Sequence, residues 1–301
     1  MIPSTSPPDE MRLRRAGRKD APRAGVSLPP RATGRVARTV VAGRAMRRIT
    51  MLQIAAVAGL VASPLAAGAA DPVIVYAAAS LKEAFEAAAP AFTKASGGTM
   101  VRFDFGGSDA LAAQLLQGAP ADVFVAANAA QMQRVSALTN EPKTLAHNSL
   151  VVVVRSSARN VASLADLAKG GVKIVLAAPT VPVGAYARTA LVTLAKDPAF
   201  GANYVAGVNA NVVSEETDVK AVATKVALGE ADAGIVYATD VTPQIASKVR
   251  VLRFPPATAP QATYPIAVLK AAPNASGAKA FVDFITSPAG LAFLKARGFE
   301  E

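Results

Sequence analysis

Five junctions that follow predicted buried strands carry neutral hydrogen-bond donors. The junctions are Ala77-Ala-Ala-Ser80-Leu, Phe105-Gly-Gly-Ser108, Val181-Pro-Val183-Gly184, Glu216-Thr-Asp-Val219 and Gly234-Ile-Val-Tyr237. They supply hydroxyl groups, and they supply backbone N–H groups in the first turns of predicted helices, where no intrahelical acceptor is available. The positive end of the helix dipole lies at the same place. Such donors bind small anions, so the chemistry indicated is anion capture.

Each junction also has a plainer interpretation. Ser80-Leu-Lys-Glu83 matches a capping box, in which Ser80 would only cap the helix that follows. Thr217 is expected to cap the helix that begins at 218. A Gly-Gly-Ser loop is often an ordinary turn, and a strand-end tyrosine such as Tyr237 often lies in the core or at its rim. The repetition of one construction along the chain favours a shared binding role.

Strands and helices alternate along the chain after residue 70. The predicted strands are 73–77, 100–105, 122–126, 149–154, 173–177, 211–214, 233–237, 249–254 and 264–269, and the predicted helices are 81–95, 109–117, 128–138, 163–169, 184–196, 218–228, 275–286 and 288–296. This alternation is typical of an α/β fold, in which right-handed crossovers bring the ends of parallel strands to one edge of a sheet. Ligands bind at that edge in open sheets.

The two long apolar strands, 149–154 and 264–269, are predicted to connect two lobes and to pair with each other. The domain prediction is then a first lobe from residues 71–149 and 263–301, and a second lobe from residues 150–262. Two such lobes would face each other across a cleft, with the paired strands as its hinge.

An export signal is predicted before the folded part. It consists of the basic Met46-Arg-Arg48, an apolar segment at 51–61 and small residues that end at Ala70. This pattern predicts a signal peptide at 46–70 and a periplasmic location, although the arginine pair leaves a twin-arginine route open. Residues 1–45 have no hydrophobic period. They are predicted to be a disordered leader, or an upstream extension before a true start at Met46.

Charge and composition exclude several classes of function. Residues 1–69 contain 12 basic and 3 acidic residues, a net charge of +9, whereas the remaining 20 basic and 18 acidic residues give the folded part only +2. This near neutrality argues against a nucleic-acid partner. The chain has no cysteine and one histidine, His147. Thiol catalysis, cysteine metal sites and multi-histidine zinc sites are therefore excluded, and His147 is expected at the surface or the hinge.

Eight motifs in order resemble those of the periplasmic molybdate-binding proteins of ABC importers, over residues 72–299. The motifs are Ala77-Ala-Ala-Ser80-Leu, Phe105-Gly-Gly-Ser108, Gly118-Ala-Pro-Ala-Asp122-Val-Phe, Asn148-Ser149-Leu-Val-Val-Val, Val181-Pro-Val-Gly184-x-Tyr186, Asp218-Val219, Gly234-Ile-Val-Tyr237 and Gly298-Phe299. The resemblance implies a two-lobed type II periplasmic-binding-protein fold of the α/β class. Each lobe would be a mostly parallel sheet flanked by helices, and two crossover strands would join the lobes.

The resemblance also implies the ligand and its contacts. The oxyanion would be bound by the hydroxyls and amides of Ser80 and Ser108, the amides of Val183 and Val219, and the hydroxyl of Tyr237. The protein would be a monomer and not an enzyme. It would need no cofactor and no metal cation, because the metal is bound as molybdate or tungstate, and it would deliver this oxyanion to a membrane ABC permease.

The donor set favours a fully ionised tetrahedral anion. The O–H of hydrogen phosphate would lack an acceptor, at a loss of about 1–3 kcal/mol. Asp109 departs from the family pattern, and its carboxylate would repel an anion or accept a phosphate proton if it faced inward. An outward Asp109 in the first helical turn would instead be favourable.

Other functions stay open at this point. The same fold could bind sulfate, phosphate or a small organic acid, because fold alone does not determine the ligand. A phosphoryl-transfer enzyme that uses the Gly-Gly-Ser loop is disfavoured, because the chain lacks a Gly-x-x-x-x-Gly-Lys-Ser/Thr motif and an accompanying general base. A third alternative is a sensor that uses the cleft only for signalling.

Overall fold

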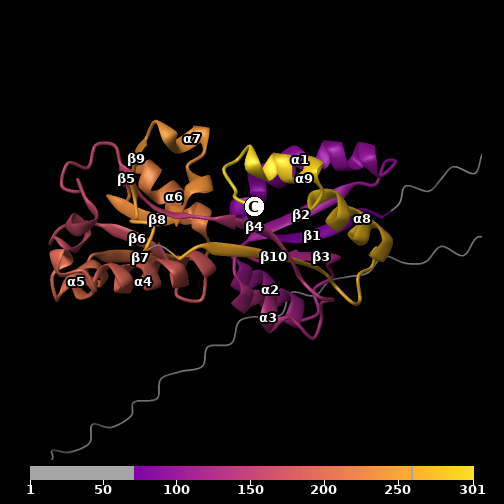
Figure 1. Cartoon of the computed structure of the whole chain (residues 1–301), viewed down its shortest axis with the longest axis horizontal. Coiled ribbons are helices and arrows are strands. Elements are labelled where there is room, and N and C mark those ends of the chain that lie inside the picture. Colours follow the sequence, from indigo (N-terminus) through magenta and orange to yellow (C-terminus); the bar gives the residue numbers. More distant parts are fainter. Residues whose placement is uncertain (1–70, 259) are drawn as a thin grey trace, which may run out of the picture. The chain divides into compact units, whose positions relative to one another are not determined.

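The computed structural model describes residues 71–258 and 260–301 (Figure 1). The predicted leader and signal peptide lie outside the described residues and stay predictions. The described residues form two five-stranded sheets with helices packed against them. We call the first sheet with its helices the first lobe, and the second sheet with its helices the second lobe.

The first sheet has the strand order β2-β1-β3-β10-β4. Its strands are β1 (Val73–Ala78), β2 (Val101–Gly106), β3 (Val123–Val125), β4 (Lys143–Asn148) and β10 (Ala262–Val268). β1 runs parallel to β2 and β3, whereas β10 runs antiparallel to β3 and β4. The carboxyl ends of β1, β2 and β3 therefore lie at one edge of this sheet.

The second sheet repeats this plan with the order β7-β6-β8-β5-β9. Its strands are β5 (Leu150–Arg155), β6 (Ile174–Ala177), β7 (Val212–Glu216), β8 (Ala233–Tyr237) and β9 (Val249–Arg253). β6 runs parallel to β7 and β8, and β5 runs antiparallel to β8 and β9. Both sheets are thus mixed. Four strands of each sheet run in one direction, which agrees with the mostly parallel sheets expected from the sequence. The strand that enters from the other lobe, β10 in the first sheet and β5 in the second, runs against its neighbours.

Helices cover the two faces of the first sheet (Figure 1). One face carries α1 (Lys82–Ala95), α8 (Ala275–Ile285) and α9 (Pro288–Lys295), and the other carries α2 (Ser108–Leu116) and α3 (Ala129–Arg134). The second lobe contains α4 (Pro182–Leu194), α5 (Tyr204–Ala210), α6 (Val219–Leu228) and α7 (Pro243–Ala246). Single 3-10 turns lie at Ala79–Leu81, Leu164–Ala168, Pro198–Phe200 and Ala238–Asp240.

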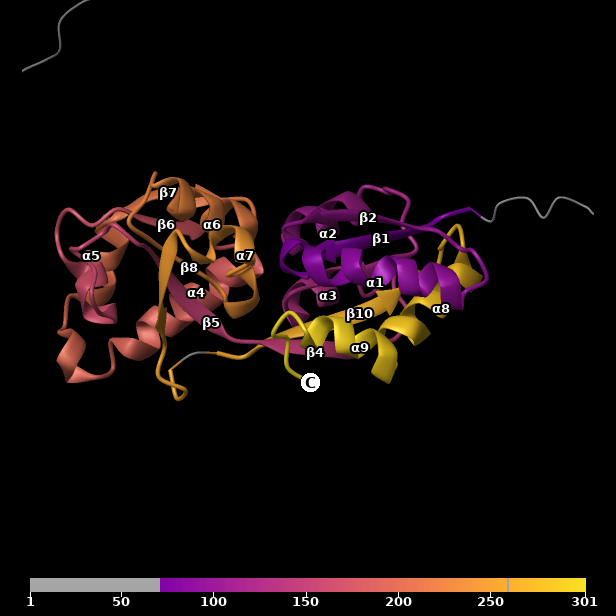
Figure 2. The same cartoon turned by 90° about the horizontal axis from the view of Figure 1, so that it is seen from above.

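Two crossover segments join the lobes, as Figure 2 shows. β4 ends at Asn148 and β5 begins at Leu150, so Ser149 alone separates a strand of one sheet from a strand of the other. The return segment leads from β9 to Ala262, which pairs with Asn148 at the start of β10. The predicted pairing of 149–154 with 264–269 is wrong, because β5 pairs with β8 and β9 and β10 pairs with β3 and β4.

Tertiary contacts explain the other departures from the predicted elements. The helix predicted at 128–138 ends at Arg134, and the carbonyl of Leu138 accepts the N–H of Lys270 after β10 at 2.8 Å. The segment 163–169 is a 3-10 turn instead of an α-helix. The unpredicted α5 packs on that turn, where the hydroxyl of Tyr204 donates to the carbonyl of Leu164 at 2.8 Å.

An aromatic cluster fixes α1 on the first sheet. The rings of Phe85 and Phe92 meet Phe281 of α8 edge-on, with centroid separations of 5.7 and 5.3 Å. Phe103 of β2 lies 5.6 Å from Phe85. All but Phe103 are fully buried, and contacts of this kind add to the free energy gained from burying the rings. The cluster therefore holds the first turn of α1 at a fixed place beside the end of β1.

Asp122 joins three elements at the opposite edge of the first sheet, before β3. Its fully buried carboxylate accepts the N–H of Ile74 in β1 at 2.7 Å and the N–H of Asn274, the residue before α8, at 2.6 Å. Two backbone donors thus depend on a single side chain, which explains why an aspartate stands in an otherwise apolar strand entrance.

Replacement of Asp122 by Ala should lower the free energy of unfolding by about 2–5 kcal/mol, because two buried N–H groups lose their acceptor. Chemical denaturation of the ligand-free protein measures this loss. Asp283→Asn is the matched control, since it removes an exposed ion pair with Lys279 and should cost less than about 1 kcal/mol. Equal losses in the two variants would contradict the role assigned to Asp122.

Candidate anion-binding site

The five predicted site residues line one cavity between the lobes. Its lining residues are Ala78, Ala79, Ser80, Gly106, Gly107, Ser108, Ala127, Val181, Pro182, Val183, Asp218, Val219 and Tyr237. The empty space measures about 210 Å³ with the solvent at its mouth included. Strand ends and helix starts of both sheets therefore meet around a space no larger than a small ion with a few waters.

Ser80 lies in the 3-10 turn before α1 and does not cap this helix. Leu81 occupies the cap position, and no side chain there accepts a helix N–H. The capping-box prediction is therefore wrong, because Glu83 instead bonds to Lys220 of the second lobe at 2.8 Å. The hydroxyl of Ser80 lies 2.9 Å from the phenol oxygen of Tyr264.

A buried chain of hydrogen bonds orients Ser80. The side-chain amide of Asn148 donates to the hydroxyl oxygens of Thr239 at 2.8 Å and of Tyr264 at 3.3 Å. Tyr264 can then donate its own proton to Ser80, which leaves the Ser80 proton for the cavity. Burial also raises the pKa of Tyr264 far above its usual range, so this phenol keeps its proton. Sequence reasoning missed Tyr264 and Asn148, although Asn148 stands within a family motif.

Ser108 is the first residue of α2, as the Gly-Gly-Ser pattern predicted. Its oxygen accepts the N–H of Ala127 at 3.0 Å, so its proton is left to donate elsewhere. The preceding Gly107 approaches the second lobe so closely that a Cβ at this position would overlap the carbonyl of Thr217. Any larger residue at 107 would push the two lobes apart.

The second lobe presents two helix starts to the cavity. Pro182 is the first residue of α4, so the amide of Val183 lies in the first turn and has no intrahelical acceptor. Gly184 allows this turn to pack on β6, since a Cβ here would overlap the carbonyls of Ala177 and Ala178.

The other helix start is that of α6. Asp218, and not Thr217 as predicted, caps this helix by accepting the N–H of Ala221 at 3.0 Å. Adjacent Thr and Asp are both good caps, and the sequence does not decide between them. The cap uses the amide of Ala221, so the amide of Val219, the first residue of α6, is still available at the cavity.

Tyr237 ends β8 with its side chain 1% exposed. Its hydroxyl is buried and has no hydrogen-bond partner among the described residues. Burial raises the pKa of this phenol well above its usual value, so the oxygen keeps its proton and is a donor. A buried hydroxyl without a partner costs free energy, and a hydrogen-bond acceptor in the cavity would remove this cost.

Asp109 does not line the cavity. Its carboxylate accepts the hydroxyl proton of Thr180, a second-lobe residue, at 2.8 Å. His147 likewise lies outside the cavity, in β4, where its ring nitrogen is 3.2 Å from the hydroxyl of Thr263. Within residues 71–258 and 260–301, no three His, Asp or Glu side chains are grouped so that they could hold a metal ion.

A charged cluster that sequence reasoning missed lies beside the donors. The ammonium of Lys220 is 2.8 Å from a carboxylate oxygen of Glu83 and 3.2 Å from one of Asp240. Burial lowers the pKa of Lys220, but the two carboxylates outweigh it and the net shift is upward. Burial raises the pKa of Asp240 to about 6 although Lys220 lowers it. A positive charge in the first turn of a helix is disfavoured by the helix dipole. A lysine at position 220 was therefore the one sign in the sequence that a carboxylate partner lies nearby.

The comparisons with known proteins agree with this geometry. The family model described as bacterial extracellular solute-binding protein matches residues 73–300. The chain belongs to this family. The molybdate-binding protein ModA of Mycobacterium bovis is 38% identical over 256 residues, which cover 81% of this chain and 93% of the relative.

Solved structures of solute-binding proteins share the fold. The periplasmic molybdate-binding protein of Azotobacter vinelandii superposes with a TM-score of 0.62 at 22% identity, over 76% of this chain and 99% of its own. The sulfate-binding protein SubI of Mycobacterium tuberculosis gives 0.68 at 18% identity, over 76% and 86%. The two-lobed type II fold expected from the sequence is confirmed.

Asp240 should make stability depend on pH. Its raised pKa means that the folded protein binds this proton more tightly than the unfolded chain does. The stabilisation is present below the ordinary pKa near 4 and is lost as the pH rises through about 6, a change of about 3 kcal/mol. Denaturation between pH 4 and 7.5 should therefore show Asp240→Asn gaining stability relative to the natural protein as the pH rises. If the free energies of unfolding of the two proteins differed by the same amount at every pH, the raised pKa of Asp240 would be contradicted.

Proposed function

We propose that this chain is an exported binding protein that captures molybdate, and tungstate, in the cavity between its lobes and delivers it to an ABC permease. The observation that carries the proposal is the convergence of Ser80, Ser108, Val183, Val219 and Tyr237 on one small cavity, where the buried Tyr237 hydroxyl has no other partner among the described residues. The name of the Mycobacterium bovis relative supports the same ligand.

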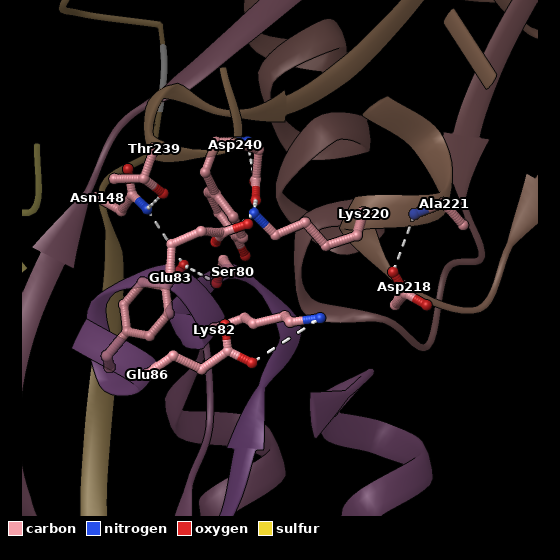
Figure 3. Close-up of polar contacts among 12 residues, drawn as sticks. Ser80, Lys82, Glu83, Glu86, Asn148, Asp218, Lys220, Ala221, Thr239 and Asp240 are labelled. Atoms are coloured by element: carbon pink, nitrogen blue, oxygen red, sulfur yellow. Dashed lines mark hydrogen bonds and ion pairs between the residues drawn. The ribbon is translucent and has the colours of Figure 1, made fainter. Parts of the chain in front are cut away.

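The donor chemistry supports a fully ionised anion. The oxygen of Ser108 accepts the N–H of Ala127, and the oxygen of Ser80 can accept the proton of Tyr264, so both serine protons are able to donate to a ligand. Two helix starts add amides and aligned dipoles, and these can stabilise a buried dianion without a cationic side chain. Asp218 is the single carboxylate in the lining set, and Figure 3 shows it bonded to Ala221.

The size of the cavity supports an inorganic ligand over an organic acid. Its 210 Å³ is an upper bound, because solvent at the mouth is included. The space that the lining residues themselves enclose is smaller still, and it suits a small tetrahedral oxyanion better than a carboxylic acid with a carbon skeleton.

Sulfate is the second candidate, because it has the same charge and tetrahedral shape. The fold likeness to SubI, which is named for sulfate, supports this candidate at the level of the scaffold alone. The two anions differ in size, so the choice depends on the distances between the donors. Asp109 is bonded to Thr180 and is absent from the lining, so it supplies no acceptor for the proton of hydrogen phosphate.

The remaining features fit delivery better than catalysis. The cavity-lining residues include no histidine, lysine or arginine, and their one carboxylate caps a helix. No helix of the described residues is long and apolar enough to cross a bilayer. A periplasmic monomer that passes its ligand to a membrane permease is consistent with the predicted signal peptide at 46–70.

The direct test is a thermal-shift titration of the chain that begins at residue 71 with equal concentrations of molybdate, tungstate, sulfate and phosphate. Molybdate and tungstate should raise the melting temperature most, and a ligand at 100 times its dissociation constant adds about 2.7 kcal/mol of stability. Phosphate should have little effect. A larger response to sulfate would favour the second candidate, and no response to any of the anions would contradict the proposal.

Tyr237→Phe and Ser80→Ala should separate ligand contact from scaffold. Tyr237→Phe removes a hydroxyl that has no partner among the described residues, so the ligand-free stability should hold or rise while molybdate affinity falls about 5- to 150-fold. Ser80→Ala should lose similar affinity and also about 1 kcal/mol of ligand-free stability, because Tyr264 loses its partner. Calorimetric titration and denaturation measure both. Unchanged affinity in Tyr237→Phe would place the anion elsewhere.

A further inference from the structure

The ammonium of Lys220 joins carboxylates from both lobes. Lys220 in α6 and Asp240 after β8 belong to the second lobe, and Glu83 in α1 belongs to the first. Figure 3 shows the ammonium end of the Lys220 side chain at the carboxylates of Glu83 and Asp240. The bond to Asp240 can exist in any arrangement of the lobes. The bond to Glu83 can exist only when the lobes are closed.

Burial makes this bond across the lobes stronger than an ordinary surface pair. The side chains of Lys220 and Glu83 are 24% and 26% exposed, and that of Asp240 is 0% exposed. Asp240 also accepts the N–H of Tyr237 at 3.1 Å, so its position is fixed. Charges that are this poorly hydrated interact across a low effective dielectric, and separating them costs more than separating solvated groups.

Each member of the cluster lies close in sequence to a proposed ligand contact. Glu83 follows Ser80 by three residues, Lys220 directly follows Val219, and Asp240 follows Tyr237 by three residues. One ammonium therefore ties together the three turns that carry three of the five donors. Movement of any one turn would disturb both the ion pair and the cavity.

We propose that Lys220 is a positioning residue that, through its bond to Glu83, holds the lobes closed around the bound anion and slows its release. The inference rests on the proposed function and adds to it a group that does not touch the ligand. It also gives a reason for a lysine in the first turn of α6, where the helix dipole opposes a positive charge.

A purely electrostatic role for the cluster predicts the opposite effect of Glu83. Two carboxylates and one ammonium leave a net charge of −1 beside an anion site. Removal of the Glu83 charge would then strengthen anion binding. If Glu83 instead holds the lobes together, its removal weakens binding. The sign of the change in Glu83→Gln therefore distinguishes the two roles.

The experiment measures the release of radiolabelled molybdate from the natural protein and from Glu83→Gln. We expect release about 5- to 30-fold faster in Glu83→Gln, with the same melting temperature in the absence of ligand. Lys225→Met is the matched control, because Lys225 lies on the same helix and its 2.7 Å pair with Glu216 stays within the second lobe. Release from this control should change less than about twofold.

A double-mutant cycle with Lys220→Met tests the pair itself. The Glu83→Gln change should have little further effect once Lys220 is absent, because the bond that it would break no longer exists. Lys220→Met leaves Asp240 buried without its cation, so this variant could fail to fold. Glu83→Gln alone then decides the outcome, and tighter binding or unchanged release in it would overturn the inference.

Closure is measured separately with spin labels. The chain has no cysteine, so spin labels attach only at the two introduced positions, Lys94→Cys in the first lobe and Lys196→Cys in the second. Both positions are exposed. The distance between the labels should shorten with molybdate in the natural background, and the closed population should be smaller in Glu83→Gln at equal saturation. If molybdate neither binds nor closes the natural protein, the proposed function fails and the inference falls with it. If molybdate closes Glu83→Gln as fully as the natural protein, the inference about Lys220 is wrong and the proposed function stands.

Discussion

A dianion that leaves water must receive a hydrogen bond on each of its oxygens, and no single helix or strand can surround it. The donors must therefore come from several elements that meet at one point. In this chain the proposed donors lie on the 3-10 turn at Ser80, at the starts of α2, α4 and α6, and at the end of β8. The close packing of these turns explains the glycines at 107 and 184, where a side chain would overlap a backbone carbonyl. The cavity thus depends mainly on backbone geometry, and its lining side chains supply three hydroxyl groups as donors.

The crossover segments contribute to the site as well as joining the lobes. Asn148 stands at the end of β4, one residue before the second lobe begins, and it bonds to Tyr264 of β10 and to Thr239 of the second lobe. Tyr264 in turn meets Ser80. A change in the angle between the lobes would strain these buried bonds, because Thr239 moves with the second sheet. The orientation of the Ser80 proton therefore depends on the hinge, and this gives a physical route by which closure and ligand binding affect each other.

The sequence predicted the parts of the structure that depend on local patterns. Alternating apolar strands and helices predicted the α/β class. The five candidate residues, taken from the recurring junctions and the family resemblance, are among the residues that line the cavity. Local patterns failed where a tertiary partner decided the result. β4 is polar and was not predicted, yet it pairs with β10 and so displaces the pairing expected between the two apolar strands. Ser80 and Glu83 satisfied a capping-box pattern, but each has a partner far away in sequence, Tyr264 and Lys220. No spacing rule relates residues that are 137 or 184 positions apart.

Neutral donors and charged side chains have separate places in this protein. The proposed ligand contacts are hydroxyls and amides, whose hydrogen bonds are directional and distinguish an ionised oxygen from a protonated one. A lysine or arginine inside the cavity would attract any anion without that distinction. The charges of Lys220, Glu83 and Asp240 lie just outside the cavity, where they act between the lobes. Selection of the ligand then depends on donor geometry, while the time for which it is held depends on an ion pair whose members do not touch the ligand.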